Sequence, residues 1–264
     1  MSLFVYKMEC LTNLHVGSGD FNYGVVDNEV ERDCLSGNPV IHASGIKGAL
    51  RDMAEKQKKN VKYIFGDIGD NKESKKGAYK FFDAQLLSRP LRVNGSESIS
   101  YISVTTPEII NNFIDTLNDF GVANTLNKIN VDSSNTKKFY SVDFSDTKKF
   151  YSNIKDIYIE SDEAAYKTAE IPAGVKETLD AILGGNYALV KSFDDYKLPV
   201  IARNKLGENK NLWYEEFVPH HSVFYMMIMC EDAVVDLDFS KPVQFGGNSS
   251  IGYGYTKINA FEVK

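Results

Sequence analysis

The segment SVFYMMIMC at 222–230 is the feature that most constrains the fold. Its apolar residues follow one another without the polar alternation of a half-exposed strand, and the run is short. A short segment that is apolar on both sides is typical of a strand in the middle of a sheet, where both faces are covered. The sequence therefore predicts a sheet with 222–230 as a central strand.

Other segments carry regular patterns that predict further elements. A strand is predicted over 4–10, because apolar side chains recur there at every second position. Capping residues and apolar stripes predict three helices, which lie over 44–54, 106–121 and 172–183. Further strands are predicted at 80–87, 154–160 and 255–263, and a loop with an apolar centre is predicted at 56–76.

Length and composition allow either one large domain or one domain with insertions, because 264 residues with 43% hydrophobic content can bury a large core. We favour a single domain over 1–264 with insertions at approximately 56–80 and 127–162. The second insertion repeats the hexapeptide TKKFYS at 136–141 and 147–152, which indicates a local duplication in a surface insertion. A platform that stacks bases is the alternative, since basic pairs precede the aromatic residues.

Localisation and charge narrow the possible partners. No run of about 18 apolar residues occurs, and the N-terminus alternates apolar and charged residues, so we expect a cytoplasmic protein without membrane contact. The cysteines Cys10, Cys34 and Cys230 form no CxxC pair and are expected to be buried thiols. A net charge of −6 argues against a broad cationic surface for nucleic acid. Bound RNA would therefore need a local groove.

The histidines form no recognisable metal-binding spacing such as HExxH. His220 and His221 are adjacent and are expected on opposite faces of a strand, which argues against a shared site. No GxSxG elbow occurs either, so a hydrolytic triad is disfavoured. The remaining candidate chemistry lies between His15 and Asp52.

The first candidate site is the glycine turn at 17–19, which follows His15 and contains Ser18. Glycine lets a backbone approach a ligand closely, although a plain turn is the simpler interpretation. Asp27 comes directly after a short apolar run, and one rigidly held carboxylate can orient a hydroxyl or help to hold a divalent ion. Asp27 and His15 are the two candidate catalytic residues. An ordinary surface loop is the alternative for Asp27, and a packed or solvated loop histidine is the alternative for His15.

A second candidate site lies at the start of the helix predicted over 44–54. Lys47 and Arg51 lie four residues apart on one exposed stripe of this helix, near free backbone amides. This arrangement favours the binding of a phosphate group. A solvated charged face explains the same pattern. The glycine-rich loop at 246–254 lacks the Lys-Ser/Thr pair and the following helix of an ATP-binding loop, but its amides could contact an extended backbone.

A projecting hairpin is predicted at approximately 196–220. Two extended arms, 198–205 and 212–219, flank a polar tip. The aromatic residues Trp213 and Tyr214 could insert between bases, whereas a hairpin packed on its own domain is the ordinary alternative.

Six motifs in one order give a resemblance to a known family. They are His-x-Gly-Ser-Gly at 15–19, Gly-Val-Val-Asp at 24–27, Arg-Asp-x-Leu-Ser-Gly-x-Pro-Val-Ile at 32–41, Gly-x-Lys-Gly-Ala-Leu-Arg at 45–51, Leu-Trp-Tyr-Glu-Glu-x-x-Pro at 212–219 and a Gly-Gly-Asn loop at 246–248. The chain resembles the RAMP superfamily and, within it, the repeated backbone subunit family, conventionally numbered four, of the type III-B CRISPR (Cmr) effector complex. The pairing of Gly-Val-Val-Asp with Leu-Trp-Tyr-Glu-Glu is the more specific part.

The resemblance implies an α+β fold with a ferredoxin-like (RRM-like) palm, inserted finger regions and a thumb β-hairpin. It implies copies that stack along a CRISPR RNA beside other Cmr subunits, and cleavage of a complementary single-stranded target RNA. The catalytic aspartate of the family falls on Asp27, which would act with a divalent ion, Mg²⁺ or Mn²⁺. The guide contacts fall on Lys47, Arg51 and the loop residues Gly246, Gly247 and Asn248.

The chain departs from the family pattern in the last glycine loop. Ile251 and Tyr253 stand where family members often carry a basic residue, so the contact with phosphate there could be made by the main chain alone. Two other functions stay open from the sequence. One is a scaffold that binds CRISPR RNA without cutting, and the other is a guide-processing ribonuclease that uses a histidine or tyrosine near the first loop.

Overall fold

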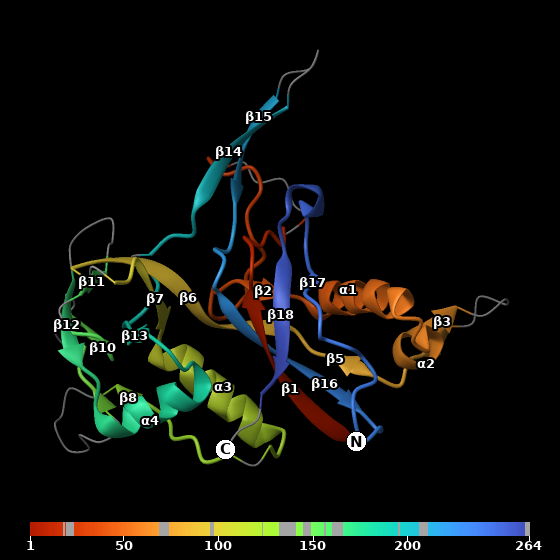
Figure 1. The fold of residues 1–264 in the computed structure, drawn as a ribbon, viewed down its shortest axis with the longest axis horizontal. Coiled ribbons are helices and arrows are strands. Elements are labelled where there is room, and N and C mark those ends of the chain that lie inside the picture. The colour runs from red at the N-terminus through yellow and green to blue at the C-terminus, as the bar shows by residue number, and fades with distance from the viewer. Residues whose placement is uncertain are drawn as a thin grey trace. The chain divides into compact units, whose positions relative to one another are not determined.

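The computed structural model describes residues 1–17, 19, 24–68, 74–95, 98–122, 124–131, 141–144, 149–155, 157–159, 166–194, 196–205 and 211–261. They fall into two compact units. The first unit consists of the described residues of Met1–Leu86 and Leu198–Glu262, and the second of those of Leu87–Lys197. The fold is α+β, and a mixed sheet of parallel and antiparallel strands dominates it (Figure 1).

The first unit is built around β16 (Val223–Cys230), which pairs antiparallel with β1 (Ser2–Cys10) and with β5 (Lys80–Phe81). Strand β18 (Tyr255–Ala260) pairs with β1, and β17 (Val243–Gln244) follows it. Side chains of β16 are buried on both faces, from Phe224 at 1% exposed through Ile228 at 0%. The prediction of a central strand is confirmed.

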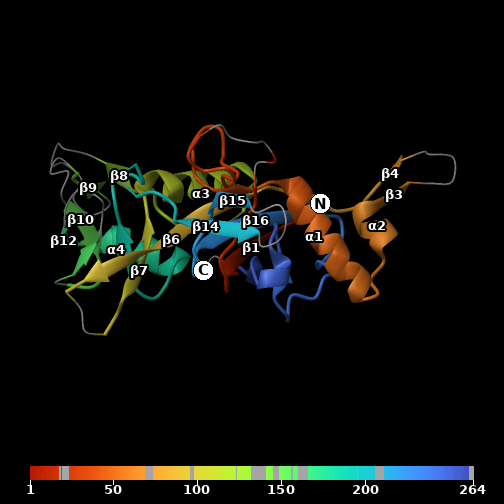
Figure 2. The ribbon, with the colours of Figure 1, turned by 90° about the horizontal axis from the view of Figure 1, so that it is seen from above.

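Helix α1 (Ala43–Lys56) begins one residue before Ser44, with His42 at its N-cap position. The loop predicted at 56–76 is wrong, because this stretch forms helix α2 (Val61–Phe65) and the strands β3 (Gly66–Ile68) and β4 (Ser74–Lys76). Asn60 caps α2 by accepting the amide of Tyr63, and Ile64 and Phe65 are buried. Tertiary burial therefore organises a segment whose polar composition favours a loop. Figure 2 shows β3 and β4 next to α2.

The predicted extended arms are the antiparallel strands β14 (Val200–Lys205) and β15 (Asn211–Glu216). They pair in register from Val200 with Glu216 to Lys205 with Asn211, and the hairpin extends away from the other strands of the first unit (Figure 1). In the same unit, β2 (Val40–Ile41) pairs with the first residues of β6 (Ala84–Asn94). The hairpin is thus a separate two-stranded sheet that projects from the first unit.

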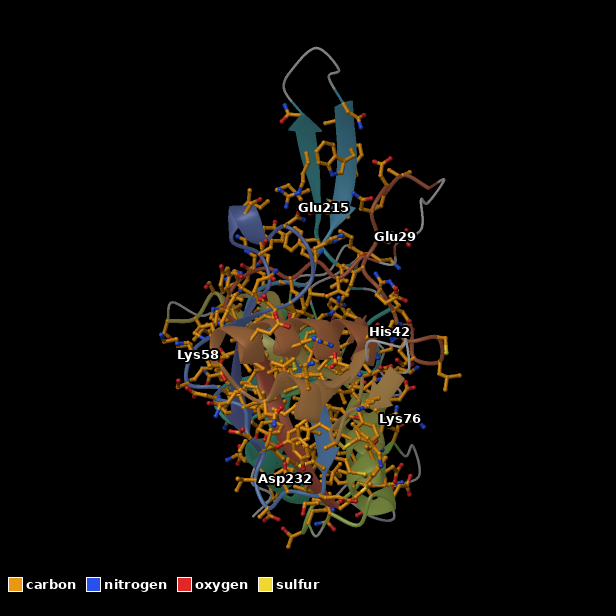
Figure 3. All side chains as sticks on the ribbon, turned by 90° about the vertical axis from the view of Figure 1, so that its right-hand side faces the viewer. Glu29, His42, Lys58, Lys76, Glu215 and Asp232 are labelled. Atoms are coloured by element: carbon orange, nitrogen blue, oxygen red, sulfur yellow. The ribbon has the colours of Figure 1, made fainter. Side chains whose placement is uncertain are left out.

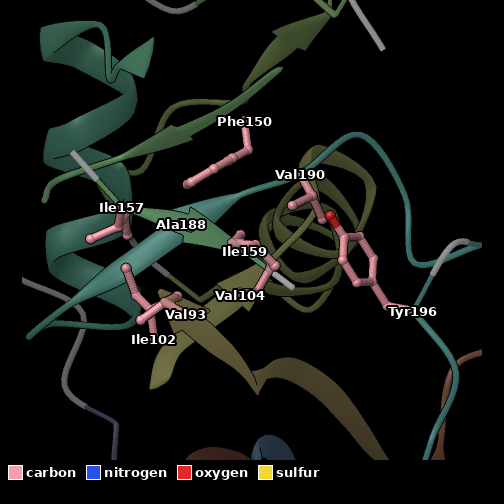
Figure 4. Close-up of a cluster of buried hydrophobic side chains, with 9 residues drawn as sticks. All are labelled: Val93, Ile102, Val104, Phe150, Ile157, Ile159, Ala188, Val190 and Tyr196. Atoms are coloured by element: carbon pink, nitrogen blue, oxygen red, sulfur yellow. The ribbon is translucent and has the colours of Figure 1, made fainter. Parts of the chain in front are cut away.

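In the second unit the strand pairings form a closed cycle. Strand β6 pairs with β7 (Tyr101–Thr105), and the cycle continues through β13 (Tyr187–Leu189), β10 (Lys149–Ser152), β12 (Tyr166–Glu170) and β11 (Tyr158–Ile159) back to β6. Figure 4 shows one cluster of its buried side chains, which includes Phe150, Ile159 and Val104. This cycle gives the second unit a hydrophobic core of its own.

Helices α3 (Pro107–Asp119) and α4 (Ala173–Ile182) lie in the second unit and confirm the predicted helices there. The short strands β8 (Asn130–Val131) and β9 (Ser141–Val142) pair in parallel. The second TKKFYS copy corrects the prediction of a surface insertion, because Phe150 is fully buried in β10. The first copy lies almost entirely outside the described residues. Within the described ranges, no helix is long and apolar enough to cross a membrane.

Candidate functional site

Asp27 is fixed against the projecting hairpin of the first unit. Its Oδ2 accepts the backbone amide of Tyr214 at 2.7 Å, and its own amide donates to the Tyr214 carbonyl at 3.0 Å. The amide of Asn28 donates to the same carbonyl at 3.1 Å. The loop that carries Asp27 therefore runs along β15 (Figure 3, where Glu215 and Glu29 mark the strand and the loop). Asp27 is half-buried and held rigidly, as a catalytic carboxylate requires.

Two buried acids on β15 hold the surrounding loops in place. Glu216 is 7% exposed, and its carboxylate accepts the amide of Val30 at 3.1 Å and Nη2 of Arg32 at 2.6 Å. Glu215 is 4% exposed, and its Oε1 accepts Nε of Arg203 at 2.8 Å. Successive strand side chains point to opposite faces, so the two acids serve different neighbours.

His15 is buried beside the same strand. Its Nδ1 lies 2.7 Å from the carbonyl oxygen of Glu216, which can only accept, so Nδ1 carries the hydrogen. The other ring nitrogen faces Gly17, where an added Cβ would come within 3.0 Å of it. His15 therefore contributes to packing between the first glycine turn and the hairpin. Ser18, which follows Gly17, lies outside the described residues.

The last glycine loop packs against the first one, although they lie at opposite ends of the chain. The amide of Gly247 donates to the carbonyl of His15 at 2.9 Å. Gly246 has φ +71°, and a Cβ there would come within 2.3 Å of the same carbonyl oxygen. Asn248 adopts a left-handed conformation, and its Nδ2 donates to Oε1 of Glu215 at 2.7 Å. Two predicted sites thus meet at the base of the hairpin.

The aromatic residues of the hairpin differ in exposure. Tyr214 is 41% exposed and Trp213 is half-buried, so Tyr214 presents the larger surface to a ligand. The pair His220 and His221 lies in a turn, with ring centroids 4.7 Å apart, so the prediction of opposite strand faces is wrong. The left-handed φ of +67° at His221 turns the chain before β16 begins.

The N-terminus of α1 is capped by a carboxylate from another segment. Oδ1 of Asp83 accepts the amide of Ala43 at 2.6 Å, and its Oδ2 lies 3.1 Å from Nδ1 of His42. Nε2 of His42 lies 3.3 Å from Glu31. The hydrogen bond to Asp83, followed by that to Glu31, raises the pKa of His42. Because Asp83 already accepts the Ala43 amide, a phosphate at this helix end would be bound by side chains more than by backbone amides.

The two predicted cations of this helix are both accessible to solvent. Lys47 is exposed, and Nε of Arg51 lies 3.4 Å from Glu55 in the next turn. Neither forms a hydrogen bond or ion pair with Asp27. The structure brings Asp27, His15 and the last glycine loop to the hairpin base. The two cations lie elsewhere, on the solvent-accessible side of α1.

Among the described residues, a divalent ion at Asp27 would find no cluster of His, Cys, Asp or Glu side chains to complete its coordination. Oδ2 of Asp27 is engaged with Tyr214, which leaves Oδ1 as a ligand. Mg²⁺ is commonly bound by one or two carboxylates together with substrate phosphates and water. Asp27 could therefore supply one carboxylate oxygen to an ion whose other ligands are water and phosphate.

Several residues of this site carry no recognisable signal in the sequence. Arg32, Arg203, Glu215 and Glu216 form the ion pairs, yet Arg32 and Glu216 are 184 positions apart. Only the adjacent acids in Leu-Trp-Tyr-Glu-Glu point to these ion pairs in the sequence. Two acids in a predicted strand must each find a partner when they are buried.

A family comparison matches the description "RAMP superfamily" over residues 7–257. One relative, from Pyrococcus furiosus, is named CRISPR system Cmr endoribonuclease Cmr4 and is 27% identical over 100% of this chain and 97% of its own length. Another, from Saccharolobus solfataricus, is named CRISPR system CMR subunit Cmr4 and is 24% identical over 96% of this chain and 94% of its own.

Solved structures show the same fold. A chain of the type III-B Cmr-beta complex bound to cognate target RNA superposes with a TM-score of 0.76 at 21% identity, covering 99% of this chain and 98% of that one. Oligomeric Cmr4 from Pyrococcus furiosus superposes with a TM-score of 0.70 at 22% identity over all of both chains. Because the family match spans nearly the whole sequence and the fold agrees, this chain belongs to the RAMP superfamily.

Proposed function

We propose that this chain is the repeated backbone subunit of a type III-B CRISPR effector complex, which binds CRISPR RNA and cleaves complementary target RNA with Asp27 as its catalytic residue. Its relatives' names and the likeness to a Cmr complex with target RNA support the assignment. The observation that carries the catalytic part is the carboxylate of Asp27, fixed on the hairpin by Tyr214. In this proposal the sheet of the first unit is a ferredoxin-like palm, β14–β15 is the thumb, and the insertions are fingers.

The proposed reaction is an internal transesterification. The hairpin would splay a target nucleotide so that its 2′-hydroxyl lies in line with the adjacent phosphate, and Asp27 would orient or deprotonate that hydroxyl. The 2′-oxygen then attacks phosphorus, and the bond between phosphorus and the 5′-oxygen of the next nucleotide breaks. Because Oδ2 is held by Tyr214, Oδ1 is the oxygen available to the hydroxyl. A divalent ion, when bound between Asp27 and the RNA, would stabilise charge on the phosphate.

RNA binding in this proposal uses three surfaces of the first unit. Lys47 and Arg51 on α1 contact guide phosphates, and the loop at 246–248 approaches the guide backbone. Tyr214 and Trp213 insert beside a base. Copies stack along the guide next to other Cmr subunits in the cytoplasm, so that each cleavage site is completed by a neighbour.

The test replaces Asp27 by Asn in the assembled complex. Asn keeps an oxygen that accepts the amide of Tyr214, so the loop should stay in place while the charge and basicity are lost. We expect target cleavage to fall by at least about 100-fold, which is the usual contribution of a general base. Target binding should be unchanged. Cleavage of labelled RNA and a binding titration measure the two quantities.

Asp33 offers a matched control for this substitution. Its carboxylate also accepts backbone amides, from Leu35 and Ser36, in a turn next to the same loop. D33N should therefore cleave target at the wild-type rate. If D27N still cleaves, Asp27 is only a backbone cap, and a scaffold without catalysis at this residue becomes the better function. A carboxylate that only caps the hairpin backbone would make the same contact with Tyr214, so the cleavage assay decides between the two functions.

A further inference from the structure

Arg203 occupies an unusual position between the hairpin and the last glycine loop. It lies on β14, and its side chain is 17% exposed. Nε donates to Glu215, and the guanidinium carbon lies 4.9 Å from the ring centroid of Tyr253 in the loop. Such stacking on an aromatic face fixes the plane of an arginine side chain. Arg203 therefore joins the strand to the loop through both its charge and its plane.

One donor of the guanidinium, Nη2, is buried and has no hydrogen-bond partner among the described residues. An unpaired buried donor is costly, and such groups usually have a partner. Arg32, in the neighbouring ion pair, differs in this respect: its Nη2 donates to Glu216 and its Nη1 to the carbonyl of Gly37. The free donor is thus a property of Arg203, which the otherwise similar pair lacks.

The glycine loop has few donors of its own to offer a phosphate. No Lys or Arg occurs at 246–254. Most of its amides donate within the protein, namely those of Gly247, Ile251, Gly252, Tyr253 and Gly254. A negatively charged ligand at this loop would therefore need a cation from another element. Within the described residues, Arg203 is the arginine that stacks on the loop.

We propose that Arg203 supplies the cationic contact of this loop: its guanidinium leans out of its buried position and donates through its terminal nitrogens to an RNA phosphate. This inference rests on the proposed function, since it concerns the same RNA. Glu215 and Tyr253 hold the guanidinium in one plane, which suits the two-point geometry of a phosphate. The neutral partner Asn248 also donates to Glu215, so the carboxylate stays satisfied if the arginine leans toward RNA.

The experiment measures binding of a labelled single-stranded RNA by the full chain at several salt concentrations. R203Q should reduce the slope of log affinity against log salt by about 0.7, the value for one phosphate contact on a single strand. E215Q removes the partner but keeps the arginine charge, so its slope should equal or exceed that of the wild type. R92Q is the control, because it removes one arginine charge from β6 in the second unit, and it should keep the wild-type slope.

The double variant R203Q/E215Q separates binding from folding. R203Q alone removes the positive partner of the buried Glu215 carboxylate, leaves it only the neutral donor of Asn248 and can destabilise the chain. The double variant replaces both charges by amides, so its melting temperature should recover while its slope stays reduced. Recovery of the wild-type slope in the double variant would show that the pair is purely structural. RNA binding by the wild type with an unchanged slope in R203Q overturns this inference alone, whereas no RNA binding by the wild type overturns the proposed function as well.

Discussion

His42 shows how a residue without a catalytic motif can matter for the site. Both of its ring nitrogens lie close to carboxylates, with Asp83 on one side and Glu31 on the other. Asp83 also caps α1, and Glu31 belongs to the segment that follows Asp27. His42 therefore links the loop that carries Asp27 to the start of the helix that carries Lys47.

The raised pKa of His42 predicts a pH-dependent stability. Because the folded-state pKa lies above the unfolded value of about 6.5, the stabilisation is fully present below that value and is lost as pH rises through the folded pKa. Asp83, Glu31 and the nearby Asp33 are the acids that face the ring. The free energy of unfolding of the wild type should therefore decline as pH rises through the folded pKa of His42. This decline should be absent in H42Q. Denaturant unfolding of wild type and variant between pH 5.5 and 8.5 measures it.

His220 provides the control for this effect. It is also a surface histidine, but its ring nitrogen contacts the neutral Asn13 at 3.3 Å. H220Q should keep the wild-type pH dependence. An H42Q protein that follows the same pH curve as the wild type would contradict the link between α1 and the loop.

At the scale of elements, the two glycine loops depend on close backbone contact. Gly246 and Gly252 both have positive φ, at +71° and +83°, so alanine strains both positions. At Gly252 an added Cβ meets nothing within 4 Å, while at Gly246 it would come within 2.3 Å of the His15 carbonyl oxygen. G252A should cost about 1 kcal/mol from backbone strain. G246A should cost roughly 2 kcal/mol more, because the loops must separate.

Thermal and denaturant unfolding of the two variants gives this difference directly. RNA affinity should fall in G246A, since Asn248 and Gly247 shift with the loop, and should stay near wild type in G252A. Equal losses in both variants would mean that the contact with His15 contributes nothing.

The elements that the sequence predicts are those whose burial follows a local pattern. Strand β16 is apolar at nearly every position, and α3 combines a Thr106 cap, Pro107 and a regular stripe. Helix α2 is too short for a stripe, and β10 lies in a polar, repetitive region. These two depend on distant partners, since β10 pairs with β13 and α2 packs near β5. A single sequence carries no record of such partners.

The candidate site shows the same difference between residues that a local pattern indicates and residues that depend on distant partners. The residues around Asp27 give it only a weak signal, and the role proposed for it is implied by the order of the family motifs. Its support comes from β15, and the ion pair of Arg32 with Glu216 joins segments far apart in the chain. The sequence predicts the residue types at the site, but long-range pairing decides which of them meet. Arg203 was missed for this reason.

For the whole molecule, the net charge of −6 leads us to expect that the proposed RNA binding depends on assembly. A chain that repels polyanions overall can hold RNA only where Lys47, Arg51 and the hairpin base form local cationic contacts. One copy offers few such contacts. Stacked copies along a single guide add them together, and an RNA held by one copy raises the effective concentration for the next.

We therefore expect a monodisperse monomer to bind single-stranded RNA weakly and a stacked oligomer to bind it tightly. Sedimentation of the chain over a range of concentrations, with and without RNA, measures assembly, and fluorescence anisotropy under the same conditions measures affinity. Affinity should rise with the degree of assembly, and RNA longer than the footprint of one copy should promote assembly. A K47Q/R51Q variant should lower both together, because the same phosphates that bind the chain also align its neighbours. Tight binding by a monomer, with no change on assembly, would show that one copy holds the complete RNA site.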